Sequence, residues 1–157
     1  MDLRLNERVC VVTGSTSGIG LATVMLLVEE GAQVVTSGRS HAPNVGEGLH
    51  VSADLSSPEA PANLIEAAAQ AFGQVDVLVN NAGACIHRPA LGVTAEEWRF
   101  VMDVNVNGVW NCAQEFVGRW SLNTVERSST SARSLRRSSI DRSGSRRTTL
   151  GRRRFTS

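Results

Sequence analysis

Apolar and polar residues alternate along the first 120 positions in a way that predicts alternating strands and helices. Short apolar runs rich in β-branched residues predict four strands, at residues 8–13, 33–37, 49–52 and 75–79. The first run is apolar throughout, which is typical of a strand that is buried on both faces. Strands that alternate with helices predict an α/β fold with an open parallel sheet.

Helix signals fall between these strands. Apolar stripes predict helices at 19–30 and 58–72, and Gly31 and Gly73 are suited to end them. Ser57 is placed to cap the second of these helices, with Pro58 in its first turn. The run Thr94-Ala95-Glu96-Glu97 has the sequence of a capping box and predicts a long helix to about residue 120.

The composition changes sharply after residue 120. Residues 1–120 carry 6 Arg against 13 acidic residues, whereas residues 121–157 carry 10 Arg and 10 Ser against 2 acidic residues. Few large apolar residues remain in this last part, so it cannot bury enough surface to offset its chain entropy. We therefore expect a folded domain over residues 1–120 and a disordered, basic Arg/Ser-rich tail over residues 121–157.

Composition also bears on location and on metal binding. No apolar run reaches the roughly 18 residues that span a membrane, and the short charged start is unlike a secretory signal. These features predict a cytoplasmic protein that does not bind membranes. Cys10, Cys85 and Cys112 lack a metal-ligand spacing, which favours buried thiols in a reducing cytosol over disulfides or a metal site.

A glycine-rich segment links the first predicted strand to the first helix. In this segment Gly14 permits a tight turn, Gly18 lets a phosphate approach the backbone, and Gly20 lets the helix pack close to the strand. This context predicts a dinucleotide-phosphate site, although a glycine-rich turn that binds nothing has the same composition. The candidate residues in this segment are Thr13, Gly14, Ser15, Ser17, Gly18, Ile19 and Gly20.

Three further motifs follow the TGxxxGxG segment in a fixed order. They are Ala53-Asp54-Leu55, Asn80-Asn81-Ala82-Gly83, and Trp98 with Asn105 in EEWRFVMDVNVNG. Together they make residues 6–120 similar to the short-chain dehydrogenase/reductase family. The resemblance implies a Rossmann-type doubly wound parallel sheet, of which about four strands are present.

The resemblance also implies a function and a set of binding residues. Members of this family transfer a hydride between NAD(P) and a small carbonyl or alcohol substrate. By family resemblance Asp54 and Leu55 contact the adenine side of the cofactor, and Asn81, Ala82 and Gly83 line its binding site. Asn105 matches the Asn of the family's catalytic tetrad. Homo-oligomers are usual in the family.

The end of the second predicted strand bears on the choice of cofactor. An acidic side chain there accepts hydrogen bonds from the ribose 2′-hydroxyl of NAD and repels the 2′-phosphate of NADP. This chain has Gly38 at that position, followed by Arg39, whose guanidinium pairs well with phosphate. The sequence therefore favours NADP, although Ser17 stands where many NADP-using relatives carry a basic residue.

The chain contains no Tyr, and all 16 of its basic residues are Arg. The family's general acid/base Tyr and its Lys are therefore absent, and the Ser residues of the tail match no motif of the family's catalytic Ser. We expect the chain to be inactive. One alternative is a dinucleotide-binding module whose basic tail contacts nucleic acid, which the lack of Lys and of aromatic residues in the tail disfavours. Another is a fragment that aggregates. Members of the family usually pair through the long helix that contains Asn105 and through the helix after it. Because that second helix is missing, we do not expect this chain to form the homo-oligomers that are usual in the family.

A shifted reading frame would explain the composition of the tail. With permitted codons, Thr148 to Thr156 read one base earlier gives Tyr-Asn-Ala-Gly-Lys-Ala-Ala-Val-His, which contains the family's YxxxK. The same shift turns residues 129–134 into Val-Asn-Val-Ser-Ser-Val, which has the form of the family's Ser motif. Our hypothesis is that the frame changes between residues 118 and 128.

The nucleotide sequence tests this hypothesis directly. We expect Tyr and Lys codons, four positions apart, in the shifted frame of the segment that encodes residues 148–152. Their absence from that frame would rule the hypothesis out.

Overall fold

A four-stranded parallel sheet forms the centre of the computed structural model, which describes residues 3–39, 45–46 and 48–119. The strand order is β3-β2-β1-β4, and every pair is parallel. The strands are β1 (Val9–Val12), β2 (Gln33–Gly38), β3 (Leu49–Ser52) and β4 (Val77–Val79). The predicted parallel α/β sheet of about four strands is confirmed. The predicted tail at 121–157 lies outside the described residues.

Strand β1 is central, because it pairs with β2 on one side and with β4 on the other. In this register Val11 lies between Val35 of β2 and Leu78 of β4. All four residues of β1 are at most 1% exposed, as the continuous apolar run predicts. The carboxyl ends of the four strands therefore meet at one edge of a rigid core.

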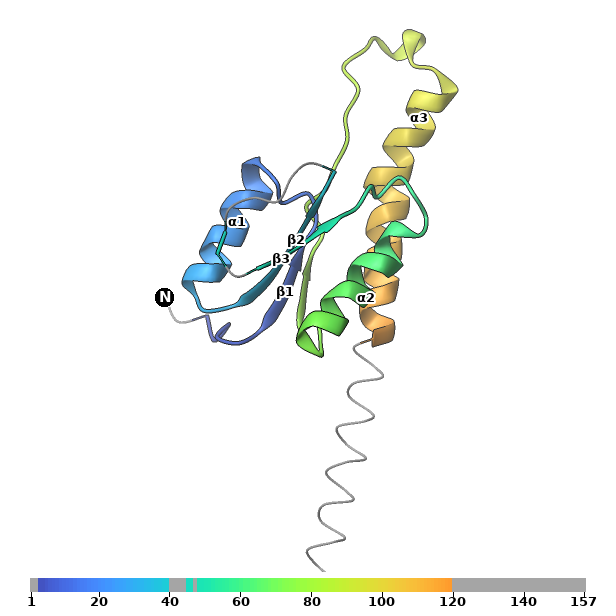
Figure 1. Cartoon of the computed structure of the whole chain (residues 1–157). Helices are drawn as coiled ribbons and strands as arrows, with labels where there is room; N and C mark the ends of the chain where they lie inside the picture. The colour runs from blue at the N-terminus through green and yellow to red at the C-terminus, as the bar shows by residue number, and fades with distance from the viewer. Residues whose placement is uncertain (1–2, 40–44, 47, 120–157) are drawn as a thin grey trace, which may run out of the picture. The chain divides into compact units, whose positions relative to one another are not determined.

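Helices cover both faces of the sheet (Figure 1). Helix α1 (Gly18–Glu29) packs on one face, where Val24 joins Val12 and Val34 in a buried cluster. Helix α2 (Ala60–Phe72) and the helix that begins with α3 (Ala95–Met102) lie on the other face. Leu64 and Ile65 of α2 are buried there against the sheet. The doubly wound arrangement is thus present around four strands.

The predicted start of α2 is wrong by two residues. The helix begins at Ala60, and Pro61 rather than Pro58 stands in its first turn. The Ser57 hydroxyl does not cap the helix, because it donates to the Glu59 Oε2 at 2.6 Å. Either proline is compatible with a first helical turn, so the sequence alone did not distinguish the two starts.

The long helix begins as predicted but changes its winding. The Thr94 hydroxyl accepts from the Glu97 N–H, and the Glu97 carboxylate accepts from the Thr94 N–H, which completes the capping box. Residues Asp103–Gly108 then form a π-helical segment, η2, and residues 109–119 continue as helix. A short 3-10 turn, η1 (Ala90–Gly92), precedes α3. The sequence pattern did not predict the π-helical segment.

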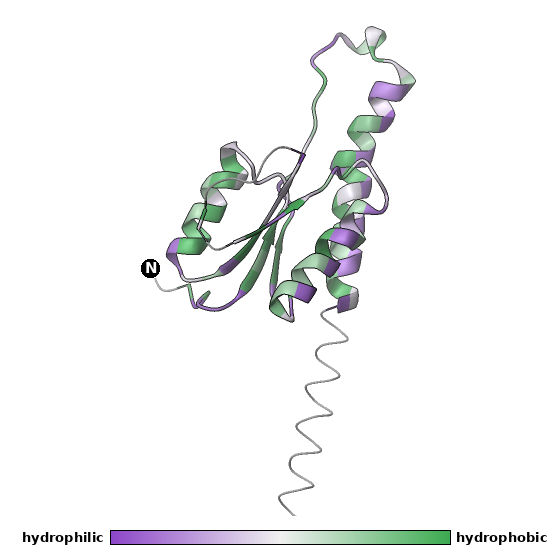
Figure 2. Ribbon diagram, viewed as in Figure 1, coloured by the Kyte–Doolittle hydropathy of each residue, from purple (hydrophilic) through white to green (hydrophobic). Residues whose placement is uncertain are grey.

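Strand β4 lies at one edge of the sheet among the described residues. Its three residues are only half-buried, although they are as apolar as those of β1 (Figure 2). Apolar side chains of the long helix are also exposed, among them Trp98 (60%) and Trp110 (65%). The open edge of β4 and the exposed tryptophans of the long helix each leave surface on which further polypeptide can pack.

The three cysteines differ in environment. Cys10 and Cys112 are fully buried, and desolvation raises the pKa of each thiol to about 11, with the negative charge of Asp76 adding to the effect at Cys10. Cys85 is exposed, so the prediction that all three thiols are buried is wrong for this one. Cys85 lies in the loop after β4, where apolar packing is not required.

Among the helices that the structure describes, none has the length and the apolar composition of a membrane span.

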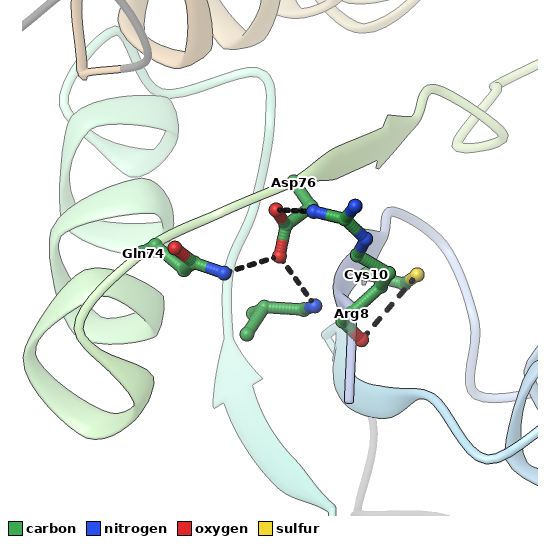
Figure 3. Close-up of polar contacts among 5 residues, drawn as sticks. Arg8, Cys10, Gln74 and Asp76 are labelled. Carbon is green, nitrogen blue, oxygen red and sulfur yellow. Dashed lines mark hydrogen bonds and ion pairs between the residues drawn. The ribbon is translucent and has the colours of Figure 1, made fainter. Parts of the chain in front are cut away.

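A carboxylate joins the start of β1 to the residues that lead into β4, at the end opposite to the glycine-rich segment (Figure 3). The Asp76 side chain accepts hydrogen bonds from the Val9 N–H at 2.9 Å and from the Gln74 amide at 2.8 Å. It also pairs with the Arg8 guanidinium at 3.0 Å. Since the Asp76 side chain is 15% exposed and that of Arg8 is 53% exposed, the bonds inside the protein carry more weight than the ion pair.

We expect replacement of Asp76 by Ala to lower the free energy of unfolding by about 2–3 kcal/mol, because it leaves the Val9 N–H without its partner. The matched change Arg8→Ala removes only the exposed ion pair and should cost less than about 1 kcal/mol. Urea unfolding of the full chain measures both. Equal losses in the two variants would contradict this assignment.

Candidate functional site

A cavity of about 350 Å³ opens at the carboxyl ends of the strands. The glycine-rich segment, the end of β2, and the loops after β3 and β4 form most of its wall. Phe100 and Val104, from the long helix, complete the wall. In open parallel sheets this edge is where ligands bind, and the volume lies within the range of small-molecule sites.

Two glycines in the segment between β1 and α1 (residues 13–18) are required by different constraints. Gly14 has a φ of +62°, and a Cβ there would lie 2.7 Å from the Cα of Ala82. The turn at Gly14 therefore packs directly on the loop after β4. Gly18 also has a positive φ, of +57°, but a Cβ there would meet nothing within 4 Å. The backbone at Gly18 is thus open to an approaching group.

Thr13 and Asn81 join the ends of β1 and β4. The Thr13 hydroxyl accepts from the backbone N–H groups of Asn81 and Ala82, both at 3.0 Å. In return the Asn81 amide donates to the carbonyls of Thr13 and Gly14, at 2.9 and 3.0 Å. Thr13 is 1% exposed and does not line the cavity. Its side chain supports the cavity wall by holding the backbone of Asn81 and Ala82.

Ser15 holds the same segment to the end of β2. Its N–H donates to the Ser37 carbonyl at 2.9 Å, and its hydroxyl accepts from the Ser37 N–H at 2.9 Å. The Ser15 hydroxyl also donates to the Val12 carbonyl at 2.7 Å. The hydroxyl of Ser37 is buried without a hydrogen-bond partner among the described residues. These bonds fix the glycine-rich segment relative to the end of β2, so the cavity is formed before any ligand binds.

The start of α1 presents unpaired backbone amides. Ser17 is the residue that precedes the helix, and its side chain makes no capping hydrogen bond. The first N–H groups of an uncapped helix are available to an anion and carry the positive end of the helix dipole. Ser17 and Ile19 are exposed at this end, which is where Gly18 leaves the backbone open. The arrangement suits a phosphate group.

The opposite part of the cavity combines a cation and a carboxylate. Gly38 is the last residue of β2, Arg39 follows it, and Asp54 follows β3. The pKa of Asp54 lies below its ordinary value, chiefly because its carboxylate accepts from the Ser56 N–H. The Ser56 hydroxyl, at 2.8 Å, and the charge of Arg39 act in the same direction, and partial burial opposes them. Asp54 is therefore ionised at neutral pH and can accept hydrogen bonds from a ligand.

Asn105 lies within the π-helical segment and is engaged with backbone. Its carbonyl oxygen accepts from the Ala84 N–H at 3.0 Å, and its amide donates to the carbonyls of Ala84 and Val101, at 2.7 and 2.9 Å. The bond to Val101 occupies a carbonyl of the helix itself, which favours local rewinding. Asn105 thus holds the chain after β4 against the helix, and it lies on an exposed face.

The structure brings most of the predicted cofactor residues to one cavity. The predicted residues that line it are Gly14, Ser17, Arg39, Asp54, Leu55, Asn81, Ala82 and Gly83. The others do not line it, namely Thr13, Ser15, Gly18, Ile19, Gly20 and Asn105, although all belong to the surrounding framework.

Several lining residues were missing from the predicted set. They include Thr16, Ala53, Ala84, Phe100 and Val104. Phe100 and Val104 stand four positions apart on a helix, a spacing that signals a shared face, but nothing in the sequence indicates what that face covers. Among the described residues no group of three or more His, Cys, Asp and Glu side chains could hold a metal ion.

Comparison with known proteins places this geometry in a family. A family model described as short chain dehydrogenase matches residues 8–129, nine residues past the end of the motif-based resemblance. The NADP-dependent (R)-specific alcohol dehydrogenase of Lentilactobacillus kefiri is 40% identical over 121 residues, which cover 70% of this chain and 47% of that protein.

Solved structures agree with the sequence matches. The ligand-free aldohexose dehydrogenase of Thermoplasma acidophilum is similar with a TM-score of 0.68 and 30% identity, over 74% of this chain and 45% of that one. A blue fluorescent protein from a metagenomic library, solved with NADPH, gives a TM-score of 0.65 at 28% identity, over 73% and 51% of the two chains. The chain spans about half the length of the curated relatives it matches.

The Asp54 carboxylate offers a test of the cavity's geometry by pH titration. We expect Ser56→Ala to raise the Asp54 pKa partway towards its ordinary value, because the hydroxyl bond is lost and the backbone bond remains. The stability that Asp54 contributes in the native chain is present above its unfolded pKa and is lost as the pH falls through its lower folded value. Carboxyl-carbon NMR of the full chain measures the pKa.

Ser57→Ala is the matched control, since the Ser57 hydroxyl is the main reason that the Glu59 pKa lies below its ordinary value. This variant should raise the Glu59 pKa and leave that of Asp54 unchanged. An Asp54 pKa that responds equally to both variants would refute the contacts described here.

Proposed function

Because the chain belongs to the short-chain dehydrogenase family, we propose that its described part binds a nicotinamide dinucleotide at the cavity and favours NADP. The observation that supports this most strongly is the Gly14–Gly18 turn. It is fixed to the ends of β2 and β4 by Ser15 and Asn81, and its backbone is open at Gly18, where a Cβ would meet nothing within 4 Å. This combination of a fixed turn with an open backbone suits a pyrophosphate.

The remaining walls suit the rest of a dinucleotide. The uncapped start of α1 faces the phosphates with its free amides, while Asp54 and Leu55 flank the adenosine side. Asn81, Ala82 and Gly83 support the opposite side, and Asn81 acts through the backbone of Thr13 and Gly14. In this proposal Thr13 and Asn81 are positioning residues and the backbone of the turn makes the contacts.

The preference for NADP depends on Gly38 and Arg39. Position 38 has no carboxylate to repel a 2′-phosphate, and Arg39, which is exposed, lines the same cavity. The alcohol dehydrogenase relative from Lentilactobacillus kefiri is named as NADP-dependent, and the metagenomic neighbour was solved with NADPH. Both are in keeping with a 2′-phosphate at this place.

The bound nicotinamide would supply or accept a hydride, but this chain lacks the groups that complete the reaction. It contains no Tyr to exchange a proton with the substrate oxygen and no Lys to lower the pKa of a phenol. Asn105 is present, yet its side chain is engaged with Ala84 and Val101. We therefore propose that the chain binds its cofactor, positions the loop after β4, and does not reduce carbonyl substrates by itself.

A basic segment supports one alternative function. Residues 121–157, which lie outside the described residues, carry 10 Arg and could contact the phosphates of nucleic acid. Binding to DNA or RNA that weakens steeply with salt, and that disappears when residues 121–157 are deleted, would favour this alternative.

Isothermal titration calorimetry of the full chain with NADPH tests the proposed function. We expect saturable binding of one NADPH per chain, and no oxidation of NADPH when ketones or aldehydes are added. Absence of NADPH binding would refute the proposed site. Robust turnover would refute the proposed lack of catalysis.

The role of Arg39 is tested by Arg39→Gln, which removes the charge and keeps most of the side chain. We expect the Kd for NADPH to rise about tenfold, which corresponds to one charge-assisted hydrogen-bond pair, and the Kd for NADH to change little. Arg88→Gln is the matched control, since Arg88 pairs with Glu97 outside the cavity wall. If NADPH and NADH lose affinity equally in the Arg39 variant, the 2′-phosphate is not recognised there.

A further inference from the structure

The four strands divide into two unequal groups about the point where the strand order reverses. From β1 the chain proceeds to β2 and β3 on one side and then returns to β4 on the other, so the reversal lies between β1 and β4. In open doubly wound sheets a dinucleotide lies across this point, with one nucleotide over each half of the sheet. Among the described residues one half consists of β1, β2 and β3, whereas the other has β4 alone.

The burial of the cavity wall follows the same division. On the side of β2 and β3, the lining residues Ser37, Ala53 and Leu55 are buried. On the side of β4 the wall consists of residues 81–84, none of which is buried, and Gly83 is exposed. A ligand group over β2 and β3 is therefore enclosed by protein, whereas a group beyond β4 meets an open wall.

The loop after β4 leaves the cavity directly after this wall. Ala84 is held to the long helix by its bonds to Asn105. The chain then runs away from the sheet to η1 and to the start of α3 (Figure 1). Residues 85–92 do not line the cavity, and all of them except Ile86 are exposed. This loop therefore does not enclose the part of a ligand that extends past β4.

The size of the cavity agrees with the enclosure of one nucleotide. Its volume of about 350 Å³ lies near the lower end of the range for sites that bury most of a drug-sized ligand. A nicotinamide dinucleotide is larger, since it consists of two nucleotides joined by a pyrophosphate. The turn at Gly14 and the guanidinium of Arg39 both belong to this cavity. The pyrophosphate and the 2′-phosphate therefore have partners here, whatever group the second phosphate carries.

We propose that the site binds 2′-phosphorylated adenosine 5′-diphosphates as a class and does not discriminate among them by the group on the second phosphate. NADPH, oxidised NADP and the nicotinamide-free compound 2′-phospho-ADP-ribose are then equivalent ligands. The inference rests on the proposed function, because it names the ligand class of the same cavity. Its consequence is that the chain binds the cofactor without sensing whether the nicotinamide is oxidised or reduced.

Calorimetry of the full chain with these three ligands tests the inference. We expect their Kd values to agree within about threefold, because the nicotinamide adds no enclosed contact. Arg39→Gln should raise all three Kd values by the same factor of about ten, since the three ligands share the 2′-phosphate. Cys85→Ala is the matched control. Cys85 is exposed in the loop after β4 and does not line the cavity, so this variant should leave all three Kd values unchanged.

Saturation-transfer NMR of bound NADPH shows which half of the ligand contacts the protein. When the methyl protons of the chain are saturated, the adenosine protons should lose intensity and the nicotinamide protons should lose much less. Equal loss at both rings would overturn the inference, because it would place the nicotinamide against protein. Circular dichroism verifies that each variant is folded.

The outcomes distinguish the inference from the proposed function. If the native chain binds none of the three ligands, the proposed function fails. If it binds NADPH about tenfold or more tightly than 2′-phospho-ADP-ribose, the nicotinamide has a site of its own and only the inference fails. A difference of that size between NADPH and oxidised NADP would likewise overturn the inference and leave the proposed function in place.

Discussion

The reciprocal hydrogen bonds between Thr13 and Asn81 are the constraint on which the site depends. They join the carboxyl ends of two strands that are 68 residues apart in the chain, and they do so from behind the cavity. Because Thr13 and Asn81 satisfy each other's backbone groups, the turn at Gly14 can lie against Ala82 without unpaired polar atoms. The conformation of the glycine-rich turn is therefore set by the sheet and does not require a bound ligand.

A second contact of this kind, between Ser15 and Ser37, fixes the other side of the turn. The turn is thus preorganised, and in the proposed function it would meet the pyrophosphate that is common to nicotinamide dinucleotides. The residues that a dehydrogenase needs for catalysis do not belong to this preorganised turn. Asn105 is the one candidate from the catalytic set. It lies on an exposed face and is bonded to Ala84 in the loop after β4. In the proposed function, binding and catalysis therefore separate along this chain, and the residues proposed to bind the cofactor are among those that the structure describes.

Much of the fold could be predicted because each signal was local. The continuous apolar run of β1, the glycine stop at Gly73 and the capping box at Thr94 each act over a few residues, and the structure has all three. The start of α2 was wrong because the Ser57 hydroxyl is taken by Glu59. The π-helical segment was missed because the apolar pattern does not show the bonds of Asn105, which run to Val101 within the helix and to Ala84, 21 residues away.

The same distinction applies to the site. The motif residues were found because they are contiguous and ordered, whereas Phe100 and Val104 reach the cavity through the packing of the long helix, which lies directly against Leu55 at Gly108. Hydrogen exchange of the full chain with and without saturating NADPH tests the central claim most directly, since it locates binding residue by residue. The account predicts slower exchange at amides 14–20, 38–39, 54–56 and 81–84. Exchange at the carboxyl end of α2 should not change. Protection that is absent from residues 14–20, or that falls mainly elsewhere, would contradict it.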